Sequence, residues 1–235
     1  MSTSESQKES KKPAPHRLRL PRFSAARLLI ALALLFLFLP FAEERKGGDL
    51  VVSILLCLVL ISAVFAVGRR GRSLIFPALL AFCGVAGRWM NYFRPDLVPS
   101  AVFLIAGLVL IIFVVANLLR FVLRAPQVDS EVLCASVSAY LLLGLAWTMA
   151  YWFVAEMTPN AFSFNTAAVA KESMEGFNAV YFSFVTLSTV GYGDITPISK
   201  VARMLAALEA MTGLLYVAVL IARLVSVYSS HQGRD

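Results

Sequence analysis

Charged residues are scarce in this chain. Asp, Glu, Lys and Arg together make up 15% of its 235 residues, whereas hydrophobic residues make up 59%. A soluble domain of this length carries far more charge, so the composition excludes that class and indicates a membrane protein. The period-2 alternation of a membrane barrel is also missing, which leaves helices as the spanning form.

Cysteine is rare as well. The three cysteines, Cys57, Cys83 and Cys134, all fall inside hydrophobic segments and share no spacing suited to metal ligation. We interpret them as small apolar residues rather than as disulfides or metal ligands. The sequence predicts no cofactor. It also shows no internal repeat, which disfavours a transporter built from repeated units.

Six hydrophobic segments are long enough to cross a bilayer as helices. They cover residues 24–42, 50–67, 73–92, 99–123, 131–155 and 200–228. A short joint follows the fourth segment, where Pro126 breaks the helix and Asp129 or Ser130 can cap the next one. The joint divides the chain into a four-helix transmembrane block, 23–124, and a second domain, 131–228.

Lys and Arg residues are distributed unevenly around these segments. Two thirds of the 21 lie on one set of flanks, namely the N-terminal tail and the ends of the second, fourth and sixth segments. Cytoplasmic flanks carry the excess of Lys and Arg in membrane proteins. Both termini are therefore predicted to be cytoplasmic in a multi-pass protein of the plasma (inner) membrane, with loop 156–199 entering from outside.

Much of the net charge of +7 lies in the N-terminal tail, residues 1–22. This tail is rich in Ser, Lys and Pro, and we expect it to be disordered. The basic residues flank membrane segments, and no folded basic domain accompanies them. We therefore expect contact with anionic lipid headgroups at the cytoplasmic face, and no contact with nucleic acid.

One motif in the loop 156–199 carries most of the functional information. Its residues are Thr189, Val190, Gly191, Tyr192, Gly193 and Asp194, which read TVGYGD. Glycine at alternate positions permits backbone angles that a Cβ would resist, so the loop can present its carbonyl groups to an ion. Residues 189–192 would offer oxygens to a dehydrated K⁺, while the side chains of Val190 and Tyr192 pack behind the loop. A ring of carbonyls needs four such loops and the chain has one, so a homotetramer is predicted.

The segment TLSTVGYGD resembles the selectivity filter of the potassium channel superfamily. The resemblance includes the spacing of Pro197, Arg203 and Gly213 after the motif, and it covers roughly residues 131–228. Over residues 1–130 only the helix count is similar to the six-helix members. The resemblance implies an all-α membrane protein with six transmembrane helices, and a re-entrant pore helix and filter between helices 5 and 6. It also implies ion conduction and no enzymatic activity.

Two residues behind the motif depart from the pattern of relatives. Val185 takes the place of a carboxylate found in a small bacterial channel, and Phe182 takes the place of a Trp that donates a hydrogen bond to the filter Asp. Phe has no such donor, so Asp194 needs another partner, for which the sequence offers Tyr181 or water. We expect selectivity to survive, because the carbonyl ring is intact.

The pore helix is expected over residues 175–187, with Ser173 as its N-cap. The last hydrophobic segment would carry the gate. Gly213 is the candidate hinge, because glycine weakens a helix by roughly 1 kcal/mol relative to alanine; close helix packing is the alternative. Helical spacing places four aliphatic residues on one face that would line the cavity: Leu214, Val217, Ile221 and Val225.

Two further observations concern charges in the spans. Glu209 is an acidic residue well inside a predicted span, where it would accept bonds from the pore helix or change its protonation, or else serve a purely structural bond. The fourth segment has no internal arginine, and Arg120 and Arg124 lie at its cytoplasmic end. The first block therefore lacks the arginine array of a voltage sensor.

Three functions remain open at this point. The first is a tetrameric potassium-selective channel gated by bending of the inner helix or at the filter. The second is a non-conducting membrane sensor or assembly subunit that reuses the pore fold. The third is a poorly selective cation channel. The intact TVGYG favours the first, since an unused filter would be free to lose its glycines.

Overall fold

The computed structural model describes residues 24–43, 48–67, 82, 100–165 and 173–232. Its elements in chain order are α1 (Ser24–Glu43), α2 (Gly48–Val67), α4 (Ser100–Arg124), α5 (Ser130–Met157), β1 (Phe162–Phe164), α6 (Gly176–Leu187), β2 (Ile195–Pro197) and α7 (Lys200–Gln232). This part of the chain is therefore almost entirely helical, with one two-stranded antiparallel sheet.

Four of these helices are long and apolar enough to cross a membrane. They contain the windows Ala25–Ala42, Leu104–Arg124, Ser130–Met157 and Lys200–Val227. These windows match the first, fourth, fifth and sixth hydrophobic segments, in agreement with an all-α membrane protein. α2 covers the second segment, with a shorter apolar stretch at Ile54–Ala63. The third segment, 73–92, lies outside the described residues except for residue 82.

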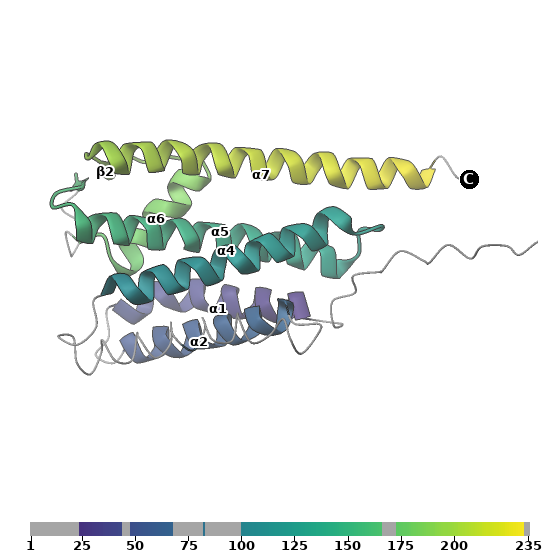
Figure 1. Ribbon diagram of the computed structural model, residues 1–235, viewed down its shortest axis with the longest axis horizontal. Helices are drawn as coiled ribbons and strands as arrows, with labels where there is room; N and C mark the ends of the chain where they lie inside the picture. Colours follow the sequence, from purple (N-terminus) through teal and green to yellow (C-terminus); the bar gives the residue numbers. More distant parts are fainter. Residues whose placement is uncertain (1–23, 44–47, 68–81, 83–99, 166–172, 233–235) are drawn as a thin grey trace, which may run out of the picture.

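α5 occupies the centre of the arrangement. Figure 1 shows it between α7 on one side and α4, α1 and α2 on the other, while the short α6 crosses from α5 to α7. One apolar core joins the N-terminal helices to α5, and its buried members include Leu28, Leu32, Leu110, Leu118 and Leu142. Dense side-chain packing of this kind is what associates helices in a bilayer. α5 is therefore a shared wall between the N-terminal helices on one side and α6 and α7 on the other.

The joint between α4 and α5 is held by two hydrogen bonds. The Asp129 carboxylate caps α5 by accepting from the backbone N–H of Val132 at 2.9 Å, as the sequence predicts. Nη2 of Arg223, toward the far end of α7, donates to the carbonyl of Ala125 at 2.7 Å. The last helix is thereby attached to the joint across 98 positions of sequence.

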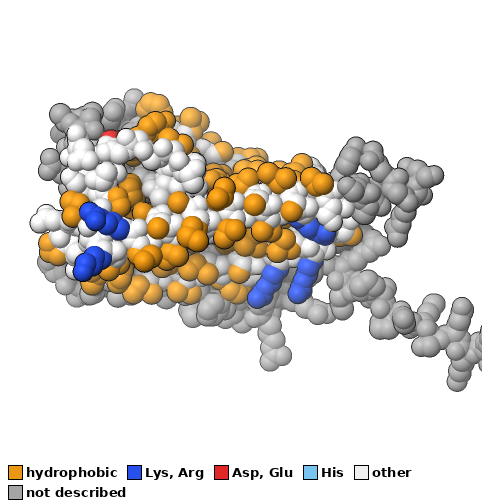
Figure 2. All heavy atoms as spheres, turned by 90° about the horizontal axis from the view of Figure 1, so that it is seen from above, with side chains coloured by type: hydrophobic (Ala, Val, Ile, Leu, Met, Phe, Trp, Pro, Cys, Tyr) orange, Lys and Arg blue, Asp and Glu red, His pale blue; other side chains and the backbone are white. Residues whose placement is uncertain are grey.

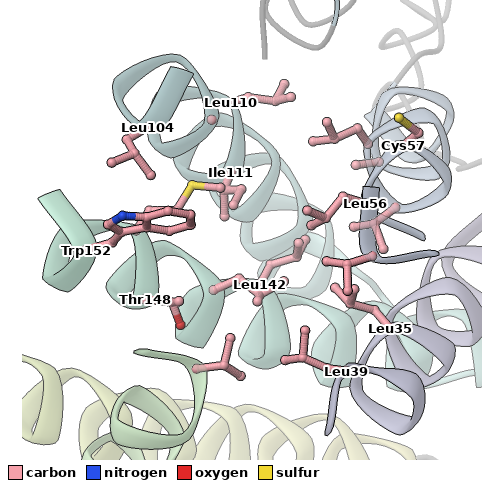
Figure 3. Close-up of a pocket in the computed structure, with 18 of the residues that line it drawn as sticks. Leu35, Leu39, Leu56, Cys57, Leu104, Leu110, Ile111, Leu142, Thr148 and Trp152 are labelled. Carbon is pink, nitrogen blue, oxygen red and sulfur yellow. The ribbon is translucent and has the colours of Figure 1, made fainter. Parts of the chain in front are cut away.

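A cavity of about 160 Å³ lies between α1, α2, α4 and α5 (Figure 3). Its lining is largely apolar and includes Leu35, Leu56 and Leu110. Cys57 also lines it and is a free cysteine, which agrees with its interpretation as a small apolar residue. Val180 of α6 completes one wall, so the cavity extends from the N-terminal helices to α6.

The distribution of charge along the surface fits a membrane protein. Figure 2 shows the face that carries α7, where hydrophobic side chains cover the middle and Lys and Arg gather toward the two ends. Lys200 and Arg203 lie at the start of α7, whereas Arg120 and Arg124 lie at the end of α4. Basic residues at both margins of an apolar middle are typical of membrane spans.

Candidate functional site

The TVGYGD loop begins where α6 ends. Three backbone hydrogen bonds turn the chain there: Ser188 N–H donates to Phe184 O at 3.0 Å, Thr189 N–H to Thr186 O at 2.9 Å, and Val190 N–H to Val185 O at 2.9 Å. The carbonyls at a helix C-terminus lack partners inside the helix, so these bonds satisfy them. The first residues of the loop are thus anchored on the last turn of α6.

The backbone of the loop has positive φ at every second residue. The values are 59° at Thr189, 58° at Gly191 and 80° at Gly193. Glycine adopts such angles without steric cost, whereas a non-glycine residue such as Thr189 adopts them under strain. In an extended strand successive carbonyls point to opposite sides. A left-handed residue at every second position removes that alternation, so consecutive carbonyls can face the same side.

The two sides of the loop differ in what they contact. An ideal Cβ placed on Gly191 or Gly193 meets no atom within 4 Å, so the glycines lie on an open side in a single chain. Val190 and Tyr192 line a groove together with residues of α6, and the Tyr192 ring stacks on Tyr181 with centroids 6.5 Å apart. Both side chains are still 53% and 72% exposed. They lie on the pore-helix side of the loop, where the sequence predicts them.

Asp194, at the outer end of the loop, is held by α6. The Tyr181 hydroxyl donates to Asp194 Oδ2 at 2.7 Å, and the backbone N–H of Ile195 donates to Oδ1 at 3.0 Å. Tyr181 is one of the two partners that the sequence offers for this carboxylate. Phe182 is instead buried against Tyr151, with ring centroids 4.9 Å apart, and plays no part in the bond.

A small two-stranded antiparallel sheet supports the same end of the loop. β1 pairs with β2 in the register Phe162 with Pro197, Ser163 with Thr196, and Phe164 with Ile195. β1 follows α5 and β2 follows Asp194 directly. The next residue after β1, Asn165, continues the contact by donating its backbone N–H to Asp194 O at 2.7 Å. The role of Asn165 cannot be anticipated from the sequence, because nothing in a three-residue strand signals its distant partner.

Glu209 of α7 lies where three helices meet, and its side chain is completely buried. Tyr151 of α5 donates to Oε2 at 2.5 Å, and Ser183 of α6 donates to Oε1 at 2.6 Å. Ser183 Oγ also lies 2.8 Å from the Gly144 carbonyl of α5, and a hydroxyl has one proton for these two acceptors. Glu209 is thus hydrogen-bonded both to α6 and to α5. This agrees with two of the hypotheses from the sequence, a bond from the pore helix and a structural bond to a neighbouring helix.

Two glycines permit close helix contacts beside this cluster. A Cβ on Gly213 of α7 would lie 2.1 Å from the Leu187 carbonyl oxygen at the end of α6. A Cβ on Gly144 of α5 would lie 2.5 Å from the Phe184 ring. Atoms cannot approach so closely, so both positions need glycine for packing. α7 is continuous through Gly213, and this geometry supports the packing alternative to the hinge.

The four aliphatic residues below Gly213 lie on the open surface of α7. In the single chain their exposed fractions are 66% for Leu214, 43% for Val217, 56% for Ile221 and 57% for Val225. No described element of the same chain covers this face. The loop and this face of α7 are therefore both left open.

Comparison with known proteins points to the same region. Residues 132–230, from α5 to α7, match a family described as "Ion channel". The chain is 31% identical over 110 residues to "Two-pore potassium channel 4" of Arabidopsis thaliana, and 33% identical over 90 residues to "Protein LctB" of Bacillus caldotenax. The matches cover 47% and 38% of this chain, and 38% and 66% of the two relatives. No solved structure matches the chain.

The family match coincides with the helices that hold the TVGYGD loop. It begins two residues into α5 and ends within α7, so it includes α6, the loop and the Glu209 cluster. An ion channel with a loop of this kind is a membrane protein, as the apolar helices indicate. The region from α5 to α7 is therefore similar to the ion channel family, and one of the relatives that it resembles is named as a potassium channel.

Proposed function

We propose that this protein is a potassium-selective channel that conducts K⁺ through a filter formed by Thr189 to Gly193. The observation that carries the proposal is the positive φ at residues 189, 191 and 193, in a loop anchored at one end on Val185 and at the other on Tyr181. A loop fixed at both ends can hold its carbonyls where they replace the hydration shell of an ion. The name of the Arabidopsis relative also points to potassium.

The channel is a homotetramer in this proposal. In a single chain the loop from residue 188 to residue 193 is exposed, and only 11% of the α7 span is buried. One loop cannot surround an ion, and four copies around an axis would complete the ring. The same assembly would place Leu214, Val217, Ile221 and Val225 around a central cavity, with aliphatic side chains that close it by dewetting.

Six transmembrane helices and a re-entrant α6 complete the proposed architecture. α6 is too short to cross a bilayer, and it is followed by the exposed loop, as a re-entrant helix would be. The protein would lie in the plasma membrane with both termini in the cytoplasm. Arg120, Arg124 and Arg223 would then face anionic lipid headgroups at the cytoplasmic surface. Glu209 and Gly213 would transmit movements of α7 to the pore helix, because both contact α6.

Ion flux into liposomes tests this proposal. Purified protein should pass K⁺ and Rb⁺ and largely exclude Na⁺. Gly191→Ala should abolish the flux, because alanine resists the φ of 58° at that position. Ile198→Ala, an exposed residue just beyond the loop, is the matched control and should conduct like the parent. Equal Na⁺ and K⁺ flux would favour a poorly selective channel, and an intact tetramer without flux would favour a non-conducting subunit.

A further inference from the structure

We infer that Asn165 is a positioning residue that holds the outermost carbonyl of the filter. Its side-chain Nδ2 donates to Gly193 O at 3.1 Å, across 28 positions of sequence. Gly193 is the last residue of the loop with positive φ, and its carbonyl directly precedes Asp194. This inference rests on the proposed function, in which that carbonyl faces the outer mouth of the pore.

The orientation of the Asn165 amide follows from its three partners. A carbonyl oxygen can only accept, so the group that faces Gly193 O must be the NH₂. Nδ2 also lies 3.3 Å from Thr196 Oγ1, and Oδ1 accepts from the Ser163 hydroxyl at 3.0 Å. Every part of the amide is therefore engaged. The side chain cannot rotate away from Gly193 without losing its other bonds.

The β1–β2 sheet fixes the backbone of Asn165 relative to the filter. β1 and β2 pair just before Asn165 and just after Asp194, and the Asn165 N–H continues that ladder to Asp194 O. The other end of β1 is fixed as well, because Ala161 O accepts from Ile198 N–H at 2.8 Å. The backbone that carries the amide is thus hydrogen-bonded at both ends of β1.

Two independent restraints consequently meet at the outer end of the filter. Tyr181 holds the Asp194 carboxylate from the side of the pore helix, and Asn165 holds the Gly193 carbonyl from the side of the β1–β2 sheet. The residue pair that braces this position in some relatives is replaced here by Val185 and Phe182, neither of which has a polar side chain. Asn165 would supply part of the missing support.

Loss of the Asn165 amide should let the Gly193 carbonyl leave its place when K⁺ is scarce. In Asn165→Ala, conduction should decline faster at low external K⁺ and recover at high external K⁺, because bound ions hold the carbonyls in line. The decline should be roughly fivefold faster than in the parent, the factor expected for one ordinary hydrogen bond between neutral groups. Asn165→Asp keeps the size but loses the donor, and it should behave in the same way.

Two control variants separate this role of Asn165 from a general contribution to the β1–β2 sheet. Ser163→Ala and Thr196→Val each remove one other partner of the amide and leave its bond to Gly193 in place. Recordings from full-length protein in planar bilayers should show both controls close to the parent. If Asn165→Ala also matches the parent, or if both controls lose conduction as fast as Asn165→Ala, the inference is overturned.

A second measurement does not depend on conduction. Calorimetric titration of K⁺ into the detergent-solubilised tetramer, in a background of Na⁺, reports the ion concentration that orders the filter. Asn165→Ala should raise the apparent Kd roughly fivefold, while Ser163→Ala leaves it unchanged. A parent that binds K⁺ but passes none would contradict the proposed function and leave the role of Asn165 to be decided by this titration. An unchanged Kd in Asn165→Ala would refute that role.

Discussion

α5 and α7 are alike in length and hydropathy but opposite in environment. Each contains an apolar window of 28 residues, with mean hydropathy of 1.8 for α5 and 2.1 for α7. Within a single chain, however, 56% of the α5 window is buried and only 11% of the α7 window. Hydropathy alone therefore identifies a span but does not say what covers it. The difference marks α5 as an internal wall and α7 as a surface that needs other molecules.

Two of the buried residues of α7 lie where it contacts α6. Glu209 is completely buried by Tyr151 and Ser183, and Gly213 lies against the carbonyl of Leu187. Further along α7, Tyr216 donates to Ser136 O and Arg223 donates to Ala125 O, and Val227 is buried. The apolar side chains on the other face, which include Leu214, Ile221 and Val225, are open. One face of α7 is thus attached to its own chain from α6 to the α4–α5 joint, while the opposite face is left for other molecules.

The largest expected effect concerns what covers the open face of α7. If neighbouring copies cover it around one axis, cysteines at Val217 or Ile221 should cross-link between subunits on oxidation. Val137→Cys, equally exposed but on α5, should stay uncrosslinked. The three native cysteines are first replaced by serine, and products are read on non-reducing gels. Cross-linking from Val137→Cys but from neither α7 position would reverse the proposed placement of the two helices.

The next effect concerns the buried junction itself. Glu209→Ala should lower the stability of the fold by about 2–4 kcal/mol, because it leaves the buried Tyr151 hydroxyl without its acceptor and opens a cavity, while Ser183 keeps the Gly144 carbonyl. Glu209→Gln should be far milder. Its amide can donate to Ser183 Oγ, which then donates to Gly144 O, while Tyr151 donates to the remaining oxygen.

Thermal unfolding of the tetramer in detergent measures both variants of Glu209. Single-channel recording of Glu209→Gln then tests whether the carboxylate also contributes to gating. Open probability identical to the parent at every pH would assign Glu209 a purely structural role. If alanine and glutamine destabilise equally, the junction depends on charge rather than on the hydrogen-bond pattern described above.

Gly213→Ala should have a smaller effect at the same contact. The new Cβ would overlap the Leu187 carbonyl, so α7 must move away from α6 at a cost of about 1–3 kcal/mol. Leu187 immediately precedes the filter turn, and ion selectivity should therefore change together with gating. A hinge alone predicts altered gating with selectivity intact. Met211→Ala, at an exposed position one half-turn away, is the control and should change neither.

Much of the helical framework follows from the sequence. Long apolar segments predict α1, α4, α5 and α7 because twenty or so such residues suit a bilayer-spanning helix, and Asp129 predicts the start of α5. The Tyr181–Asp194 bond could be anticipated as well, because Phe182 cannot donate. These features depend on local composition or on residues a short distance apart.

Features that depend on the approach of distant segments could not be predicted. The contact between Gly213 and Leu187 depends on how closely α7 meets α6, and the Asn165 bond depends on the pairing of two three-residue strands. The start of α6 also differs from prediction. Its N-cap is Glu175, which makes no side-chain capping bond, and Ser173 instead accepts through its carbonyl from Asn178.

The smallest effect is expected from α4, the fourth of the hydrophobic segments. Its only basic residues are Arg120 and Arg124, in the last turns of the helix. A charge that crosses the whole membrane contributes ~2.3 kcal/mol per 100 mV, but residues already at the membrane margin cross little of the field. Conductance should therefore change shallowly with voltage. Replacing both arginines with glutamine should leave the slope of the conductance–voltage curve unchanged, which recordings in planar bilayers can measure. A steep curve that flattens in the double variant would show that α4 moves charge, and that the N-terminal helices do more than pack against α5.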